Sequence, residues 1–217
     1  MDLLALLREL RLLAIVRGQH RQSALETVLT LAGAGIGLIE VSLTSDAALA
    51  VIAQARAQLG AEAVVGAGTV VTARDAREAQ AAGAEFIVTP GLGAGVAEAR
   101  ELGLPVIAGV LTPTEVIAAR AAGVEAVKLF PASAGGGPDY LRALRAPFPD
   151  VPFVPVGGVD AASARRYLEL GAVAVGVGSP LIGDAADGGD AAALRERARA
   201  FRDIAGAFRD IAGDASR

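Results

Sequence analysis

The chain has 217 residues, of which 53% are hydrophobic and 4% aromatic, and it carries a formal net charge of −4. This length suits one domain with a core of Ala, Val, Leu and Ile, and the acidic balance argues against nucleic acid as a partner. The absence of cysteine excludes disulfides and thiolate metal sites. The single histidine, His20, excludes a metal site built from several histidines, and we assign it no role.

The first sixteen residues are apolar, but four charged residues interrupt them: Asp2, Arg8, Glu9 and Arg11. A secretory signal would place basic residues first and continue with an uninterrupted apolar stretch. We therefore expect an amphipathic helix that leads into a strand. Since no apolar run of the sequence reaches the length of a membrane span, we expect a cytoplasmic protein with no membrane partner.

Eight short apolar runs follow one another, each ending near Gly or Pro and leading into a segment rich in Ala, Leu, Arg and Glu. The runs are residues 12–17, 36–43, 63–70, 85–91, 105–110, 126–131, 153–159 and 172–179. Such runs are typical of strands buried on both faces, and the segments between them have helical composition. Five of these segments end in a glycine, as expected at a helix C-cap: Gly35, Gly83, Gly103, Gly123 and Gly171.

Eight such βα units in about 200 residues favour a (β/α)8 TIM barrel. A doubly wound open sheet is the alternative, although eight parallel strands would be many for it at this length. No linker or low-complexity segment divides the chain, so we predict one domain over residues 1–217, with an N-terminal helix and an extended C-terminal helix.

The carboxyl terminus contains a tandem repeat, because AFRDIAG at residues 200–206 is followed at once by a second copy. An apolar seam on one helix face would result from four residues spaced by three and four: Phe201, Ile204, Phe208 and Ile211. We predict that residues 200–217 are a duplicated helical tail that docks on the barrel or on a neighbouring subunit. The repeat glycines weaken that helix.

Polar residues and glycines recur at the carboxyl ends of the predicted strands. Strand by strand they are Arg17, Glu40, Thr69, Thr89–Pro90, Lys128, Gly157–Gly158 and Gly178–Ser179. In a barrel these ends meet at the rim that carries the active site, so the side chains are expected to face one pocket.

The last two strand ends, Gly157–Gly158 and Gly178–Ser179, fall where such barrels usually bind phosphate through backbone N–H groups and a helix N-terminus. Glycines that only make tight turns are the alternative for either pair alone. Because both pairs occur at the two expected strands, the sequence favours a phosphate site. Asp160 or Ser163 is in place to cap the helix that follows.

Lys128 is the one lysine among 20 Lys plus Arg, and it lies in an apolar run. A partly dry pocket disfavours the charged form of an amine, which leaves more of it neutral and nucleophilic. Such an amine can attack a ketone and form a Schiff base, an electron sink for carbon–carbon cleavage, whereas arginine stays protonated. A purely structural pair with a carboxylate such as Glu40 is the alternative; position and uniqueness favour chemistry.

Glu40 lies between Ile39 and Val41, where loss of solvent favours the protonated carboxyl. A carboxyl near a Schiff-base lysine can move protons during imine formation and bond cleavage. Arg17 would suit a substrate carboxylate through a bidentate contact, with an ordinary surface arginine as the alternative.

Seven motifs spread over nearly the whole chain resemble the class I 2-keto-3-deoxy-6-phosphogluconate (KDPG) aldolases and their phosphogalactonate (KDPGal) relatives: AIVRG, IEVSL, GAGTV, IVTPG, KLFPAS, PVGGV and GVGS. The resemblance implies that Lys128 forms the Schiff base and that Glu40 is the general acid/base. It implies a homotrimer that binds pyruvate and a phosphorylated keto acid and needs neither metal nor cofactor.

The resemblance also implies a role for each of the remaining site residues. Arg17 and Thr69 would lie near the pyruvate carboxylate, and Pro90 and Phe130 would shape the pocket. The phosphate would be held by four residues of the last two strand ends: Gly157, Gly158, Gly178 and Ser179.

Two positions depart from the KDPG enzymes. Those enzymes often carry arginine four residues after the glutamate, where this chain has Thr44, and P-T-G-G in the seventh strand, where this chain has Val156. Valine there resembles the phosphogalactonate enzymes. KLFPAS followed by GPDYLRAL resembles members that act on both KDPG and 4-hydroxy-2-oxoglutarate. We therefore predict that Thr44 and Val156 are specificity residues, and the preferred configuration at C4 stays open.

The sequence favours a lyase that reversibly cleaves a 2-keto-3-deoxy-6-phospho sugar acid to pyruvate and glyceraldehyde 3-phosphate. One alternative is 4-hydroxy-2-oxoglutarate cleavage as the main activity. Another is a phosphosugar epimerase or thiamine-phosphate-type transferase on the same barrel. A non-catalytic phosphosugar-binding protein is the third, and Glu40 in an apolar run argues against it.

Overall fold

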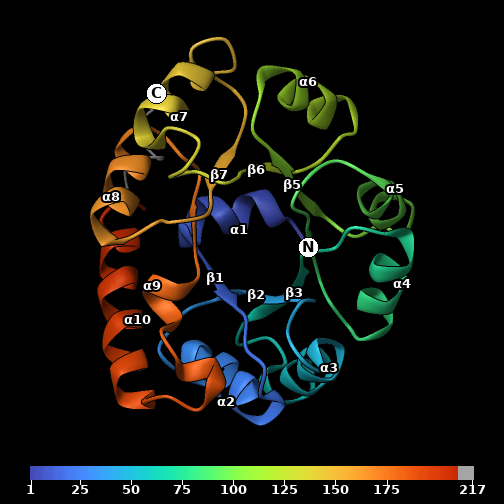
Figure 1. Ribbon diagram of the computed structural model, residues 1–217, viewed down its shortest axis with the longest axis vertical. Helices are drawn as coiled ribbons and strands as arrows, with labels where there is room; N and C mark the ends of the chain where they lie inside the picture. Colours follow the sequence, from blue (N-terminus) through green and yellow to red (C-terminus); the bar gives the residue numbers. More distant parts are fainter. Residues whose placement is uncertain (210–217) are drawn as a thin grey trace.

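A computed structural model describes residues 1–209 and shows eight parallel strands that alternate with helices around a barrel (Figure 1). Neighbouring strands are hydrogen-bonded in the order β7-β6-β5-β4-β3-β2-β1-β8, and the bridge between Val156 and Gly176 closes the ring. The strands are β1 (Leu12–Val16), β2 (Leu38–Ser42), β3 (Val64–Gly68), β4 (Ile87–Val88), β5 (Val106–Val110), β6 (Ala126–Leu129), β7 (Phe153–Pro155) and β8 (Val175–Val177). The predicted TIM barrel is confirmed, and each apolar run of the sequence contains one strand.

Helices surround the strands, and several of them begin at capping residues that can be recognised in the sequence. They are α1 (Leu3–Leu10), α2 (Arg21–Gly33), α3 (Ala48–Leu59), α4 (Ala73–Ala81), α5 (Ala94–Glu101), α6 (Pro113–Ala121), α7 (Gly137–Arg145), α8 (Ala161–Glu169), α9 (Ser179–Ile182), the 3-10 helix η1 (Ala185–Asp187) and α10 (Ala191–Gly206). Capping boxes begin three of them: Thr72 with Asp75, Thr112 with Glu115, and Asp160 with Ser163. Within residues 1–209, no helix is both long and apolar enough to span a membrane.

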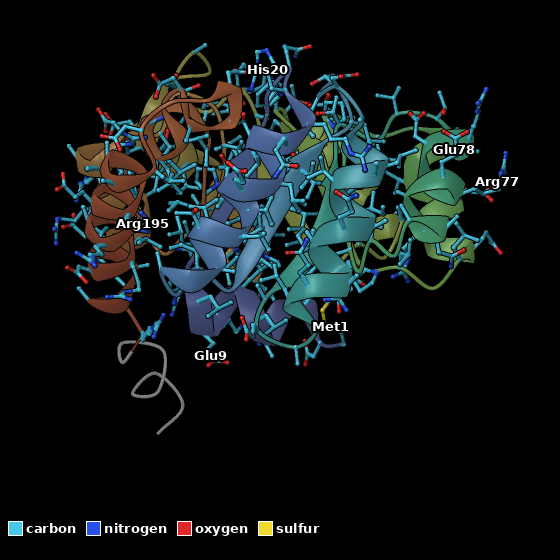
Figure 2. All side chains as sticks on the ribbon, turned by 90° about the horizontal axis from the view of Figure 1, so that it is seen from below. Met1, Glu9, His20, Arg77, Glu78 and Arg195 are labelled. Atoms are coloured by element: carbon cyan, nitrogen blue, oxygen red, sulfur yellow. The ribbon has the colours of Figure 1, made fainter. Side chains whose placement is uncertain are left out.

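Two apolar layers hold the barrel together. The outer layer lies between the strands and the surrounding helices, and the inner layer fills the barrel itself. Leu3 and Leu7 of α1 belong to the inner layer, so the predicted N-terminal helix closes one end of the barrel. Figure 2 shows Met1 and Glu9 at that end and His20 at the opposite end. The carboxyl ends of the strands are therefore left open.

The carboxyl-terminal repeat lies partly outside α10. Phe201 and Ile204 of the first copy are buried on α10, which packs against α2, α8 and α9. The helix ends at Gly206, and residues 207–209 form turns, so the predicted helix does not continue into the start of the second copy. Phe208 packs partly against the outer layer. Ile211 and the rest of the predicted tail lie outside the described residues.

Candidate active site

A cavity of about 590 Å³ lies at the carboxyl ends of the strands. Eleven of the twelve residues singled out from the sequence line it: Arg17, Glu40, Thr69, Pro90, Lys128, Phe130, Val156, Gly157, Gly158, Gly178 and Ser179. The twelfth, Thr44, is exposed outside the lining. The barrel thus brings together side chains from seven different strands or the loops that follow them.

The register of the strands determines where the two candidate catalytic residues, Glu40 and Lys128, lie in the barrel. Glu40 of β2 pairs with Ile15 of β1 and with Gly66 of β3. Lys128 of β6 pairs with Gly109 of β5 and Val154 of β7. Both side chains line the cavity because alternate residues of a barrel strand face its interior.

Glu40 and Lys128 are the two charged side chains that are buried in the described part of the chain, with 1% and 6% of their surface exposed. Burial raises the pKa of the Glu40 carboxyl above its ordinary value of 4.5, and the positive charges of Lys128 and Arg17 lower it in part. Oε2 of Glu40 is buried without a hydrogen-bond partner. The carboxyl is therefore held in the protonated form to a higher pH than an exposed glutamate, as suits a proton donor.

Lys128 is kept free of anionic partners. Its Nζ lies 5.0 Å from the centroid of the Phe130 ring, within the range of a cation–π contact. No ion pair within residues 1–209 includes Lys128 or Arg17. The structural ion pair between Lys128 and Glu40, left as an alternative by the sequence, does not form. Both residues line the cavity.

The loop after β1 carries Arg17 to the mouth of the cavity. The N–H of Gly18 donates to Oγ of Ser45 at 3.2 Å, and the N–H of Asp46 donates to the Gly18 carbonyl at 3.2 Å. The N–H of Gln19 donates to the Asp187 carboxylate at 2.6 Å. These bonds tie the loop to the loop after β2 and to η1, which holds an exposed guanidinium at one side of the cavity.

The two glycine loops present unpaired backbone donors. Gly157 and Gly158 have φ angles of +97° and +71°, a region that favours glycine. Inside residues 1–209, no backbone carbonyl accepts a hydrogen bond from the N–H groups of Gly157, Gly158, Gly178 or Ser179. Asp160 begins α8 directly after the first loop, and its side chain accepts from the Ser163 N–H, as predicted for a cap. Four N–H groups beside a helix N-terminus can bind an anion.

Three residues with a part in this geometry were missed from the sequence. A side chain on Gly68 would overlap the Glu40 carboxyl, and one on Gly109 would overlap the backbone of Pro90. Ser42, fully buried at the end of β2, contacts the hydroxyl of Thr69. GAGTV drew attention to Thr69 as part of a motif, but the sequence carries no signal of which side chain each glycine accommodates.

Several known proteins are similar to this chain in sequence and fold. Residues 3–196 match the family of KDPG and KHG aldolases. The KHG/KDPG aldolase of Escherichia coli K12 is 37% identical over 171 residues, which cover 78% of this chain and 80% of that protein.

Two solved structures are similar over almost their full length. A native KDPGal structure superposes with a TM-score of 0.85 at 31% identity, covering 92% of this chain and 96% of the other. A KDPG aldolase from Legionella pneumophila has a TM-score of 0.85 at 27% identity, covering 92% of this chain and 98% of the other. That crystal structure holds pyruvate captured at low pH as a covalent carbinolamine intermediate.

Proposed function

The chain belongs to the KDPG and KHG aldolase family, and on this basis we propose that it is a Schiff-base aldolase. Its substrate is a 2-keto-3-deoxy-6-phospho sugar acid, KDPG or KDPGal, which it cleaves reversibly to pyruvate and glyceraldehyde 3-phosphate. One observation carries the proposal: the two buried charged side chains, Lys128 and Glu40, line the same cavity without forming an ion pair. An amine nucleophile and a carboxyl with a raised pKa are the two groups that this reaction needs.

In the proposed reaction, the neutral amine of Lys128 attacks C2 of the keto acid. Glu40 supplies the proton with which the carbinolamine loses water to form the imine. As a carboxylate, Glu40 then takes the proton of the C4 hydroxyl, directly or through a water molecule. The C3–C4 bond breaks and its electron pair forms the C2=C3 double bond of the enamine, while the C2=N pair of the protonated imine moves to the nitrogen and glyceraldehyde 3-phosphate leaves. Protonation of the enamine at C3 and hydrolysis release pyruvate and restore the amine.

The remaining cavity residues fit the two charged ends of such a substrate. Arg17 and Thr69 can bind the carboxylate next to C2, since a guanidinium and a hydroxyl both donate hydrogen bonds to it. The free N–H groups of the two glycine loops can bind the phosphate at the far end. Pro90 and Phe130 line the wall between these ends. Cytoplasmic location and a homotrimer stay predictions of the sequence.

Trapping with borohydride tests the proposal. Incubation with pyruvate and borohydride should leave a reduced adduct, found by peptide mass spectrometry on Lys128. Because the chain has one lysine, the amino terminus is the other primary amine, and its peptide serves as an internal control. Lys128→Arg and Lys128→Gln should lose the adduct. If the wild-type protein gives no adduct where a known aldolase is trapped, the mechanism is wrong.

Cleavage of 4-hydroxy-2-oxoglutarate, also called 2-keto-4-hydroxyglutarate (KHG), has support of its own. The matched family and the E. coli relative both carry KHG in their names. 4-Hydroxy-2-oxoglutarate has no phosphate, so it would leave the glycine loops unused. Comparing kcat/KM for KDPG, KDPGal and 4-hydroxy-2-oxoglutarate decides which substrate is preferred. An epimerase or thiamine-phosphate-type transferase would retain most activity in Lys128→Arg, and the aldolase would not.

A further inference from the structure

Three hydroxyl groups form a chain that ends at the cavity. Oγ of Ser42 lies 2.9 Å from Oγ1 of Thr44 and 2.9 Å from Oγ1 of Thr69. Thr69 lines the cavity, Ser42 is fully buried, and Thr44 is exposed at the outer end. Ser42 and Glu40 are two residues apart on β2, so both side chains point to the interior of the barrel. The chain thus connects the surface with the cavity wall.

The inner end of this chain is held in an unusual backbone conformation. Thr69 has a φ angle of +59°, in the left-handed region that a β-branched residue rarely adopts because it is strained there. The preceding residue, Gly68, pairs with Ser42 across β2 and β3, and the N–H of Val70 donates to the Val88 carbonyl at 3.2 Å. The hydrogen bond between Ser42 and Thr69 fixes the orientation of the Thr69 side chain. A strained conformation at a cavity wall suggests that the position of the Thr69 hydroxyl matters.

Each hydroxyl donates one proton, so an anion in the cavity would set the direction of the whole chain. A carboxylate accepts only, and Thr69 must then donate to it. The oxygen of Thr69 is left to accept from Ser42, and the oxygen of Ser42 is left to accept from Thr44. Hydrogen bonds that run in one direction polarise one another, which strengthens the last donor.

We propose that Ser42 and Thr44 are positioning residues, which act through Thr69 to orient and strengthen its hydroxyl as a donor to the carboxylate of the keto acid. The inference rests on the proposed function, since it takes pyruvate as the ligand. It also gives Thr44 a role other than substrate specificity, the role predicted for it from the sequence. Thr44 lies outside the cavity and reaches the substrate only through two other hydroxyls.

The test compares pyruvate affinity in variants that remove one hydroxyl each. The two readouts are the pyruvate concentration that gives half-maximal borohydride trapping and the pyruvate dissociation constant from calorimetry. Ser42→Ala should raise both by about tenfold, the value of one hydrogen bond to a charged acceptor. Thr44→Val keeps the shape and should raise both by about threefold, while Thr44→Ser restores the hydroxyl and should match the wild type. Trapping at saturating pyruvate should stay unchanged.

A double-mutant cycle separates positioning from a structural role. In a Thr69→Val background, Ser42→Ala should have no further effect on pyruvate affinity, because the residue through which it acts is gone. The proposal is wrong if Ser42→Ala and Thr44→Val bind pyruvate like the wild type. It is also wrong if Ser42→Ala keeps its full effect in Thr69→Val, or if Thr44→Ser behaves like Thr44→Val.

Trapping and calorimetry of the wild-type protein test the proposed function independently of the variants. A wild-type protein that binds pyruvate in the calorimeter but is not trapped would overturn the Schiff base, and the dissociation constants of the variants would still decide on the hydroxyl chain. A wild-type protein that does not bind pyruvate would overturn both.

Discussion

The carboxyl group of Glu40 occupies the place that a side chain on Gly68 would need. A Cβ built on Gly68 would overlap Oε1, Cδ and Cγ of Glu40. The two residues come from the neighbouring strands β2 and β3, whose register is fixed by hydrogen bonds along their whole length. The Glu40 carboxyl can therefore be buried here only because residue 68 is a glycine.

Gly68→Ala is expected to displace Glu40 and reduce kcat for keto acid cleavage by about 100-fold, since a shift of about 1 Å in a catalytic group has that effect. Overpacking should also lower the free energy of unfolding by about 1–3 kcal/mol. Steady-state kinetics and chemical denaturation measure the two effects. Gly33→Ala is the matched control: no atom lies within 4 Å of its added Cβ, and alanine should stabilise α2 without changing kcat. Normal kcat in Gly68→Ala would contradict the assignment of Glu40.

Glu40→Gln is expected to stabilise the fold more at high pH than at low pH. Burial raises the pKa of the Glu40 carboxyl, so below its ordinary value of 4.5 the group is protonated in both the folded and the unfolded chain. As the pH rises above that value, the unfolded chain ionises first, and the stability contributed by the protonated carboxyl is lost until the pH passes the folded pKa. Each pH unit in this window is worth about 1.4 kcal/mol, or about 3–6 °C in Tm.

Melting curves of Glu40→Gln and wild type from pH 4 to pH 8 measure this difference. The gap in Tm should widen with pH while kcat of the variant falls, because glutamine cannot transfer a proton. A gap that is constant across the range would show that the pKa of Glu40 is not raised.

Gly158→Ala is expected to weaken binding of phosphorylated substrates. The φ angle of +71° at Gly158 costs alanine about 1–2 kcal/mol, and its Cβ would overlap Oγ of Ser133. KM for KDPG should rise by about tenfold, the effect of losing one hydrogen bond to a charged group. KM for 4-hydroxy-2-oxoglutarate, which has no phosphate, should change little. Gly60→Ala carries similar strain, with φ +53° and open space around it, but lies outside the cavity; it should leave both KM values unchanged.

Val156→Thr is expected to change the preference between the two epimers. Val156 lines the cavity beside Gly157 and Gly158, and threonine adds the hydroxyl that the resemblance to the KDPG enzymes leads us to expect at this position. The ratio of kcat/KM for KDPG to that for KDPGal should rise by about tenfold. Val156→Ala removes volume without adding a hydroxyl and controls for packing. An unchanged ratio in Val156→Thr would remove Val156 from the list of specificity residues.

The sequence predicted the barrel well because its signals are local. Every strand lies in an apolar run, and the five glycines predicted at helix C-caps have φ angles between +70° and +87°: Gly35, Gly83, Gly103, Gly123 and Gly171. The rule that catalytic groups gather at the carboxyl ends of barrel strands then placed eleven candidate residues around one cavity.

What the sequence could not supply were contacts between strands. Ser42 looks like any polar residue at the end of a strand until the register of β2 and β3 brings it to Thr69. Thr44 was singled out as a difference from relatives, yet its place outside the cavity depends on the course of one loop. Gly68 and Gly109 accommodate atoms that are distant in sequence, and no local pattern reports such a neighbour.

The junction between β7 and β8 is the place where a bound substrate would stabilise the barrel. These strands meet through the bridge of Val156 with Gly176 and the bond from the Val173 N–H to the Phe153 carbonyl. The loops that follow them, at Gly157 and Gly178, are the ones whose free N–H groups would bind the phosphate. A phosphate bound to both loops would therefore link β7 to β8, and these two strands would separate less readily in the presence of substrate.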